Sequence, residues 1–272
     1  MAKPNQPFIA DFKLSITKAL ATQLHETLQG IETATLQPNN VSKLEPRSGV
    51  YELFKYDRGS LARVYVGKAK SDLRARLSQH MLKISGRKGL SLEQIRFKAV
   101  YVDEDLDAAA PEKMLIDGYR KEGSVPWNTN GFGNKDPGRN RDRTLVKRNH
   151  FDALYPIDLN FIPDGQTMSG AKNTTVEEVL GSLKRAAPFN IRFESHPDLE
   201  NDFAVAPHVE SPTTIDEWIE SIIWSLPDGW QATALPGYVI IYRETQDYKA
   251  ASCYWYRTAE ITLRHTSEPS FE

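Results

Sequence analysis

The stretch SGVYELFKYDRGSLARVYVGKAKSDLRARLSQH, residues 48–80, contains two runs rich in aromatic and β-branched residues, a turn between them, and then a basic segment. Aromatic and β-branched residues favour strands, and YDRGS at residues 56–60 is typical of a tight turn. We predict two strands, at residues 49–54 and 62–67, joined as a hairpin and followed by a helix from about Asp72.

The hairpin can place two tyrosines on one surface. Successive residues of a strand point to opposite faces, so Tyr51 shares a face with Leu53. On the next strand, Tyr65 shares a face with Arg63 and Gly67. Pairing of the two strands can then bring both hydroxyl groups to the same side of the sheet.

The helix after the hairpin adds cationic groups beside these tyrosines. Arg76 and His80 are four residues apart and lie on one side of the helix, while Lys68 ends the second strand. The apolar stripe of the helix comprises Leu73, Leu77 and Ile84. The polar groups could all reach one phosphate; alternatively, the tyrosines are core aromatics and the charges are solvated.

Further elements follow from periodicity and composition. We expect an amphipathic helix at residues 11–30, a strand at residues 95–102 and a second helix at residues 107–122. Residues 124–144 contain too many Gly, Pro and Asn for regular structure. The predicted fold class is α+β (α/β), with a small sheet flanked by helices and a second small α/β domain.

Three domains are expected. They are an N-terminal helical arm at residues 1–40, a central domain at residues 41–165 and an acidic α/β module at residues 171–272, with linker character at residues 155–170. The single cysteine, Cys253, excludes an internal disulfide. No run approaches the roughly 20 apolar residues of a membrane span, and the N-terminus does not resemble a signal peptide. We therefore expect a cytoplasmic protein without a membrane partner.

Charge is distributed unevenly along the chain. Residues 41–150 hold 23 Lys and Arg against 14 Asp and Glu, whereas residues 151–272 hold 8 against 19. The middle of the chain would attract a polyanion and the end would repel one. A basic stretch can also be no more than a solvated face.

Glu112 stands at the head of an apolar stripe. It precedes residues at helical spacing on the second predicted helix, namely Leu115, Ile116 and Tyr119. A carboxylate there requires a partner, which can be a basic side chain or a divalent cation. Magnesium prefers one or two carboxylates together with water and phosphate oxygens, so a metal fits this basic region.

The order of these residues resembles the GIY-YIG nuclease superfamily. The elements of the resemblance are Gly49-Val50-Tyr51, Tyr65-Val66-Gly67, Arg76, His80, Glu112 and Asn128. WNTNGFGNKDPGRNRDRT at residues 127–144 and HFDALYP at residues 150–156 are most similar to the type II restriction endonucleases that cut GC-rich palindromes. The resemblance covers about residues 41–160 and implies hydrolysis of DNA.

The resemblance implies a role for each polar residue of the hairpin. Tyr51 would act as general base or assist it, with Lys68 close enough to lower the pKa of its hydroxyl. Tyr65 and His80 would orient the attacking water or the scissile phosphate.

It also implies how phosphate and metal are held. Arg76 would bind the phosphate, because a planar guanidinium donates two parallel hydrogen bonds to two oxygens. One extra residue before LRAR aligns the catalytic arginine with Arg76, and Arg74 is the less favoured candidate. Glu112 would hold a single Mg²⁺, and Asn128 would tie its loop to the site.

Other basic residues are predicted to bind DNA without taking part in cleavage. They are Arg74 and, after a Gly-rich turn, Arg139, Arg141, Arg143, Lys147 and Arg148. Such side chains contact phosphates or read guanine edges in the major groove. The alternative is a flexible basic loop that contacts phosphates only.

Residues 171–265 suggest two similar halves. Thr175 with Glu178, and Thr214 with Glu217, form capping-box patterns, and each helix is followed by a strand-like run. Pro236-Gly237 predicts a hairpin turn. The pattern resembles short βαβ-type modules at the N-termini of secretins and TonB-dependent receptors.

The C-terminal module has an acidic balance and tryptophans at positions that could be exposed. These features favour a role in protein contact or dimerisation, carried by Trp218, Trp224 and Trp230. The alternative is that the tryptophans fill the module's own core, above all Trp218.

Two functions remain open from the sequence. The first is a Mg²⁺-dependent restriction endonuclease that cuts double-stranded DNA, as a homodimer matched to a palindromic site. The second is an antiphage defence nuclease subunit or DNA-binding component, gated by a partner protein through residues 171–272. The fold class alone does not choose between them.

Overall fold

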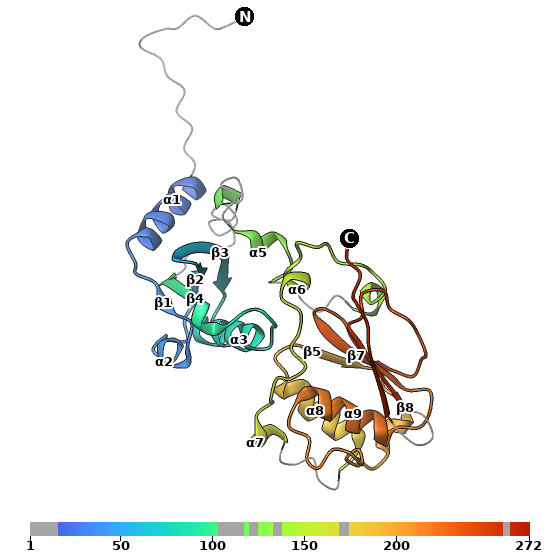
Figure 1. Ribbon diagram of the computed structural model, residues 1–272. Helices are drawn as coiled ribbons and strands as arrows, with labels where there is room; N and C mark the ends of the chain where they lie inside the picture. Colours follow the sequence, from blue (N-terminus) through green and yellow to red (C-terminus); the bar gives the residue numbers. More distant parts are fainter. Residues whose placement is uncertain (1–15, 103–116, 120–124, 133–137, 169–173, 258–261) are drawn as a thin grey trace, which may run out of the picture.

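The computed structural model describes residues 16–102, 117–119, 125–132, 138–168, 174–257 and 262–272. Within these residues the chain forms helices and two β-sheets, which confirms the predicted α+β class. One sheet has four strands in the order β1-β4-β2-β3, and the other has five in the order β5-β7-β6-β8-β9 (Figure 1). Each sheet packs against its own hydrophobic core.

The first unit contains the predicted hairpin and helix. Arg58 and Gly59 form the hairpin turn with φ of 47° and 85°, the positive values that two-residue hairpin loops require. Asp72 caps the helix by accepting a hydrogen bond from the Ala75 amide at 2.8 Å. The elements are β1 (Ala34–Thr35), β2 (Gly49–Asp57), β3 (Ser60–Ala69), β4 (Ile95–Tyr101), α1 (Ile16–Gln29), α2 (Pro38–Val41) and α3 (Leu73–Ser85).

The predicted N-terminal arm is part of this unit. Leu28 of α1 is fully buried with Val50 and Val66, and Leu36 after β1 is fully buried as well. β1 also pairs with β4. The expected boundary at residue 40 is therefore corrected, because residues 28–36 bury apolar surface against the first sheet.

A β-bulge changes one predicted face. The pairing of β2 with β3 shifts between Leu53 and Phe54, so Arg63 lies opposite Phe54. Arg63 consequently ion-pairs with buried Glu52 at 3.0 Å, on the face of the sheet opposite Tyr51. The expectation that Arg63 shares a face with Tyr65 is wrong, since a bulge reverses the alternation of side chains.

The second unit has two helices on one face of its sheet (Figure 1). Both predicted capping boxes are present, at Thr175 with Glu178 and at Thr214 with Glu217. The Pro236-Gly237 turn joins β6 to β7 as predicted. The elements are α8 (Val176–Ala186), α9 (Ile215–Ser225), β5 (Asn190–Phe193), β6 (Gln231–Ala234), β7 (Tyr238–Tyr242), β8 (Cys253–Arg257) and β9 (Thr262–Thr266).

The tryptophans belong mainly to this core. Trp218 is 8% exposed and Trp230 is 1% exposed, and both pack in the cluster between helices and sheet. Trp224 is half-buried and lies beneath the guanidinium of Arg257, which is 4.7 Å from the ring centroid. The alternative that the tryptophans fill the module's own core, favoured above all for Trp218, is therefore confirmed for Trp218 and Trp230, and a role of the module in protein contact stays a prediction.

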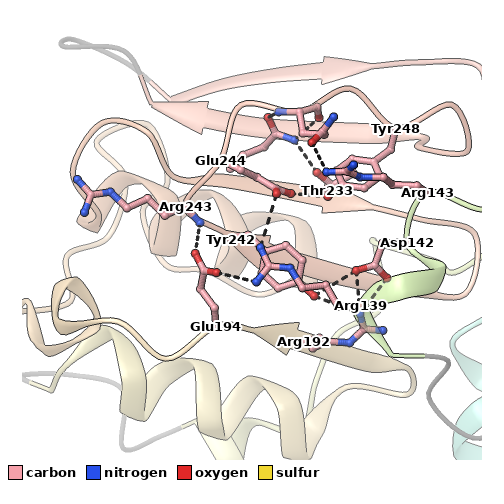
Figure 2. A network of polar contacts seen from close by, with 12 residues as sticks. Arg139, Asp142, Arg143, Arg192, Glu194, Thr233, Tyr242, Arg243, Glu244 and Tyr248 are labelled. Carbon is pink, nitrogen blue, oxygen red and sulfur yellow. Dashed lines mark hydrogen bonds and ion pairs between the residues drawn. The ribbon is translucent and has the colours of Figure 1, made fainter.

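The other face of the second sheet receives the basic loop, residues 138–148. Leu145 packs against the apolar cluster of β7 and β8, and Asp142 is only 3% exposed. Asp142 accepts hydrogen bonds from Arg192 at 2.8 and 2.9 Å (Figure 2). It also accepts one from the Tyr238 hydroxyl at 2.8 Å. A loop assigned to the first unit from sequence thus covers the sheet of the second.

The expected linker at residues 155–170 is packed rather than free. Ile157 and Leu159 are 3% and 5% exposed and belong to the second core. The Ile157 amide donates to Pro236 at 3.0 Å, and the Lys88 amide donates to Pro156 at 2.8 Å. This segment therefore connects the end of α3 to the β6–β7 turn.

Short helical turns interrupt the otherwise irregular region between the units. They are α5 (Pro126–Thr129), η2 (Arg139–Arg141), α6 (Phe151–Leu154) and α7 (Gly165–Met168). The predicted helix at residues 107–122 lies outside the described residues, apart from Asp117–Tyr119, which are helical. Within the described parts of the chain, no helix combines the length and apolar character needed to cross a membrane.

We expect Asp142→Ala to lower the free energy of unfolding by about 3–5 kcal/mol, because it leaves the guanidinium of Arg192 largely buried without its carboxylate. Urea unfolding followed by tryptophan fluorescence measures the change. Asp228→Ala, at an exposed aspartate, is the matched control and should change the free energy by less than about 0.5 kcal/mol. A loss below about 1 kcal/mol for Asp142→Ala would show that Asp142 does not anchor the loop.

Candidate functional site

Tyr51, His80 and Arg76 converge as the sequence predicted. The Tyr51 hydroxyl, on fully buried Tyr51 of β2, lies 2.6 Å from His80 Nε2. Arg76, one turn before His80 on α3, donates through Nε to the same hydroxyl at 3.3 Å. A phenol oxygen is therefore held between an imidazole and a guanidinium.

Aromatic rings enclose the imidazole. His80 is 3% exposed, stacks on Phe132 with ring centroids 4.8 Å apart, and meets the edge of Tyr65 at 5.5 Å. This burial, together with the positive charges of Arg76 and Lys83, holds the pKa of His80 well below its usual value. The ring is thus neutral at physiological pH, so one of its nitrogens can accept a proton.

Arg76 is the cation nearest the tyrosines. Burial alone would lower the pKa of Arg76, but the interactions with Tyr51 and Tyr65 outweigh it and the pKa is raised. The guanidinium is half-buried and lines the cleft between the two units. Arg76 can therefore reach an anion in the cleft while remaining next to Tyr51.

Gly67 leaves the space that the ring of Tyr51 occupies over the neighbouring strand. The two residues are paired directly across the hairpin. A Cβ at Gly67 would lie 2.5 Å from the Tyr51 hydroxyl and 2.7 Å from the ring of Tyr65. Any side chain at position 67 would consequently displace one of the two tyrosines.

Asn128 ties its loop to the hairpin, as the resemblance implies. Its Oδ1 accepts from the Val66 amide at 2.8 Å, and its Nδ2 donates to the Val66 carbonyl at 2.7 Å. The amide side chain thereby replaces a neighbouring strand at the edge of β3. This contact fixes α5 and the Phe132 segment over His80.

Lys68 and Arg74 do not join the convergence. Lys68 is paired with Val50, so its side chain leaves the sheet on the face opposite Tyr51. The implied closeness of Lys68 to the Tyr51 hydroxyl stays a prediction, which this register does not favour. Arg74 is exposed and donates through Nε to the Leu44 carbonyl, which favours Arg76 as the arginine of the site.

The predicted metal ligand, Glu112, lies outside the described residues. Among the residues that the structure describes, no group of three or more His, Cys, Asp or Glu side chains is placed to hold a metal ion. The described part of the site supplies cations and a phenol–imidazole pair. Metal binding therefore remains a prediction that depends on Glu112.

The predicted DNA-binding loop divides into two sets of side chains. Arg139 ion-pairs with Glu194 at 3.1 Å and Glu244 at 3.8 Å, and Arg143 donates to Gln246 at 2.7 Å (Figure 2). These two arginines face the C-terminal sheet. The side chains that line the cleft are instead those of Arg141 and Lys147.

Arg148 is exposed at the end of this loop. Its backbone pairs with the end of the chain, since its amide donates to the Glu272 carbonyl at 2.9 Å and the Glu272 amide donates to Val146. DNA binding by Arg148 stays a prediction.

A cleft of about 1030 Å³ separates the two units. Its walls carry Arg76 and His80 from α3, the basic loop, and Pro188, Phe189 and Tyr238 from the second unit. The charge of its cationic side chains exceeds that of its acidic ones, so the cleft favours an anion. The C-terminal unit therefore forms one wall of the candidate site.

Sequence reasoning missed several of these residues. Lys83 continues the line of Arg76 and His80 along α3, at position i+7 from Arg76, and Arg87 follows just beyond the end of the helix. This spacing was a readable signal for a basic helix face. Lys184 of α8 also lines the cleft, and no local pattern indicated it because it comes from the other unit.

No protein-family model and no curated protein matches the chain. The site's own side chains therefore indicate its chemistry. A neutral imidazole bonded to a phenol can pass a proton, and a guanidinium beside them can hold a phosphate.

We expect Gly67→Ala to disrupt the site, because the new methyl group must push the Tyr51 or Tyr65 ring aside. Overpacking of this kind destabilises by about 1–3 kcal/mol, measurable by urea unfolding, and near-ultraviolet circular dichroism should report the displaced rings. Gly165→Ala is the matched control, since nothing lies within 4 Å of the added atom. Unchanged stability and spectrum in Gly67→Ala would contradict the close packing.

Proposed function

We propose that this protein is a hydrolase of the GIY-YIG type, a Mg²⁺-dependent, site-specific endonuclease that cuts double-stranded DNA in restriction or host defence. The observation that carries the proposal is the Tyr51 hydroxyl held between His80 Nε2 at 2.6 Å and Arg76 Nε at 3.3 Å. Arg76 and His80 also line a cationic cleft. Such a cleft suits a phosphodiester backbone.

Proton transfer is the first task of these residues. Water that attacks phosphorus must lose a proton, and the Tyr51 oxygen accepts it while the phenol proton passes to neutral His80 Nε2. Attack forms the new P–O bond, and the bond to the 3′ oxygen breaks. The 3′ oxygen leaves as an alkoxide that takes up a proton from solvent, and the imidazole, which ends the step protonated, returns its proton to solvent.

In this scheme the guanidinium of Arg76 adopts two orientations, one without substrate and one with a phosphate bound. In the structure its Nε caps the Tyr51 hydroxyl. When a phosphate enters the cleft, the guanidinium turns toward the phosphate oxygens, which opens the Tyr51 oxygen to water. Donation to the developing charge then stabilises the transition state.

The proposal includes one Mg²⁺ ion held by Glu112. Such an ion supplies positive charge for the phosphate oxygens and the departing 3′ oxygen. The proposed substrate is duplex DNA in the cytoplasm. A homodimer would match a palindromic site, since two-fold symmetric protein meets two-fold symmetric DNA.

We expect purified protein to cut unmodified plasmid and phage DNA into discrete fragments with Mg²⁺ and to be inactive in EDTA. Arg76→Ala and Tyr51→Phe should each slow cleavage by about 10²–10⁴-fold, as expected for loss of an electrostatic or acid–base group. Glu112→Ala should abolish the response to Mg²⁺. Rates come from gel quantification under single-turnover conditions.

Arg185→Ala is the control for this series. Arg185 is exposed on α8, and its guanidinium donates to the Ser182 hydroxyl at 2.9 Å. Its rate should equal that of the wild type. No cleavage of any DNA by folded wild-type protein would rule out a stand-alone restriction enzyme.

A second candidate function is a nuclease or DNA-binding component gated through the C-terminal unit by a partner protein. The observation that favours it is the pairing of Arg139 with Glu194 and Glu244. The side chain of Arg139 is 59% exposed, and surface ion pairs of this kind contribute only about 0–1 kcal/mol. DNA phosphates or a partner could therefore displace the carboxylates.

Gating predicts that the double variant Glu194→Gln, Glu244→Gln binds duplex DNA more tightly than wild type, because Arg139 is released. Binding is measured by fluorescence anisotropy in EDTA. The control, Glu177→Gln with Glu210→Gln, removes the same charge from exposed positions of the same unit. Equal affinity of the two double variants would contradict gating through these carboxylates.

A further inference from the structure

Lys83 is a cation of the cleft that the proposed cleavage step does not use. It lies on α3 seven residues after Arg76, about 10 Å further along the helix axis. Both side chains line the same cleft. Lys83 thus lies away from the proposed reacting centre but on the wall of the same cleft.

A backbone carbonyl and two aromatic rings contact the ammonium group of Lys83. Its Nζ donates to the Phe132 carbonyl at 2.5 Å and lies 5.2 Å and 5.4 Å from the ring centroids of Phe132 and Phe151. Within the described residues, Lys83 forms no ion pair with a carboxylate. Among the described residues, this ammonium group thus donates one hydrogen bond, whereas an ammonium group can donate three.

Arg87, just beyond the C-terminal end of α3, gives the contrast. It is 5% exposed and pairs with Asp152 at 2.9 Å, while donating to the carbonyls of Tyr155 and Pro236. These partners explain the burial of Arg87, which has a structural role in joining the two units. Lys83 has no such set of partners.

We propose that Lys83 Nζ binds a backbone phosphate next to the one held by Arg76, which makes it a substrate-positioning residue for a nucleic-acid strand. This inference rests on the proposed function for the identity of the phosphate source. Arg141, Lys147 and Lys184 also line the cleft and extend the phosphate-binding surface to the basic loop and the second unit. The strand therefore runs along α3 between the two units.

The charge state of Lys83 supports this placement. Burial, the cations Arg87 and Arg76 and the opposing effect of Asp152 together lower its pKa to about 8. His80 and His150 face the same region. Lys83 is then mostly protonated at pH 7 and loses its charge as pH rises through 8. A bound phosphate favours the ammonium form and raises the pKa.

The test follows the lysine signal directly. Lysines labelled with ¹³C at Cε are titrated with pH by NMR, with the Lys83 resonance assigned by its loss in Lys83→Met. Titrations are run in EDTA without ligand, with inorganic phosphate, and with a short DNA duplex. We expect the duplex to raise the pKa of Lys83, and phosphate to raise it less.

Duplex affinity gives the second measurement. Lys83→Met should reduce the slope of log K against log salt concentration by about 1 and weaken binding at pH 7. Lys83→Arg should restore both and keep its affinity at pH 9, where the wild type weakens. Lys88→Met, at an exposed lysine beyond α3, is the control and should behave as wild type.

The outcomes separate this inference from the nuclease proposal. A Lys83 resonance that responds to DNA, in a protein that never cuts it, supports the phosphate site and overturns the nuclease. Cleavage that proceeds in Lys83→Met with an unchanged salt slope overturns the phosphate site alone. A pKa of Lys83 that neither phosphate nor DNA moves also overturns it.

Discussion

The hydrogen bonds of the Tyr51 hydroxyl with His80 and Arg76 depend on the absence of a side chain at the residue paired with Tyr51 across the hairpin. Gly67 is paired with Tyr51, and a Cβ there would lie 2.5 Å from the hydroxyl. The short turn before β3 pairs Phe54 with Arg63, and the bulge between this turn and the site then shifts the register so that Tyr51 pairs with Gly67. Because a slip by one residue would send Tyr51 to the other face, the whole polar convergence rests on this register.

The two units share the loop between them. Buried Asp142 binds Arg192 and two tyrosines of the second sheet, while Arg141 and Lys147 from the same loop line the cleft. Burial of a carboxylate with its partners fixes the loop far more firmly than the exposed pair of Arg139. The C-terminal unit is thus a support for the basic loop as well as a wall of the cleft.

Short sequence patterns correctly predicted the features that depend on residues close together in the chain. The hairpin, the Asp72 cap of α3 and the capping box at Thr214 all follow from short-range rules, and the structure confirms them. The convergence of Tyr51 with His80 also followed, since strand and helix periodicities fix side-chain direction.

Long-range packing decided the features that the sequence did not reveal. The bulge that turns Arg63 away, the register that separates Lys68 from Tyr51 and the docking of residues 138–148 on the second sheet each depend on contacts between distant segments. The burial of Trp230 is of the same kind, because an apolar residue lies in the core or on the surface according to the segments that pack over it.

Arg87 and Lys83 show how two neighbouring cations can differ in their partners. Both cations are withdrawn from water, Lys83 on α3 and Arg87 just after it. Arg87 pairs with Asp152, whereas the partner of Lys83 among the described residues is the Phe132 carbonyl, and the pKa of Lys83 is lowered to about 8. A methionine could fill the space of Lys83 without that penalty. A charge retained at a cost in stability, on the wall of a cleft, is best accounted for by an anion that it binds.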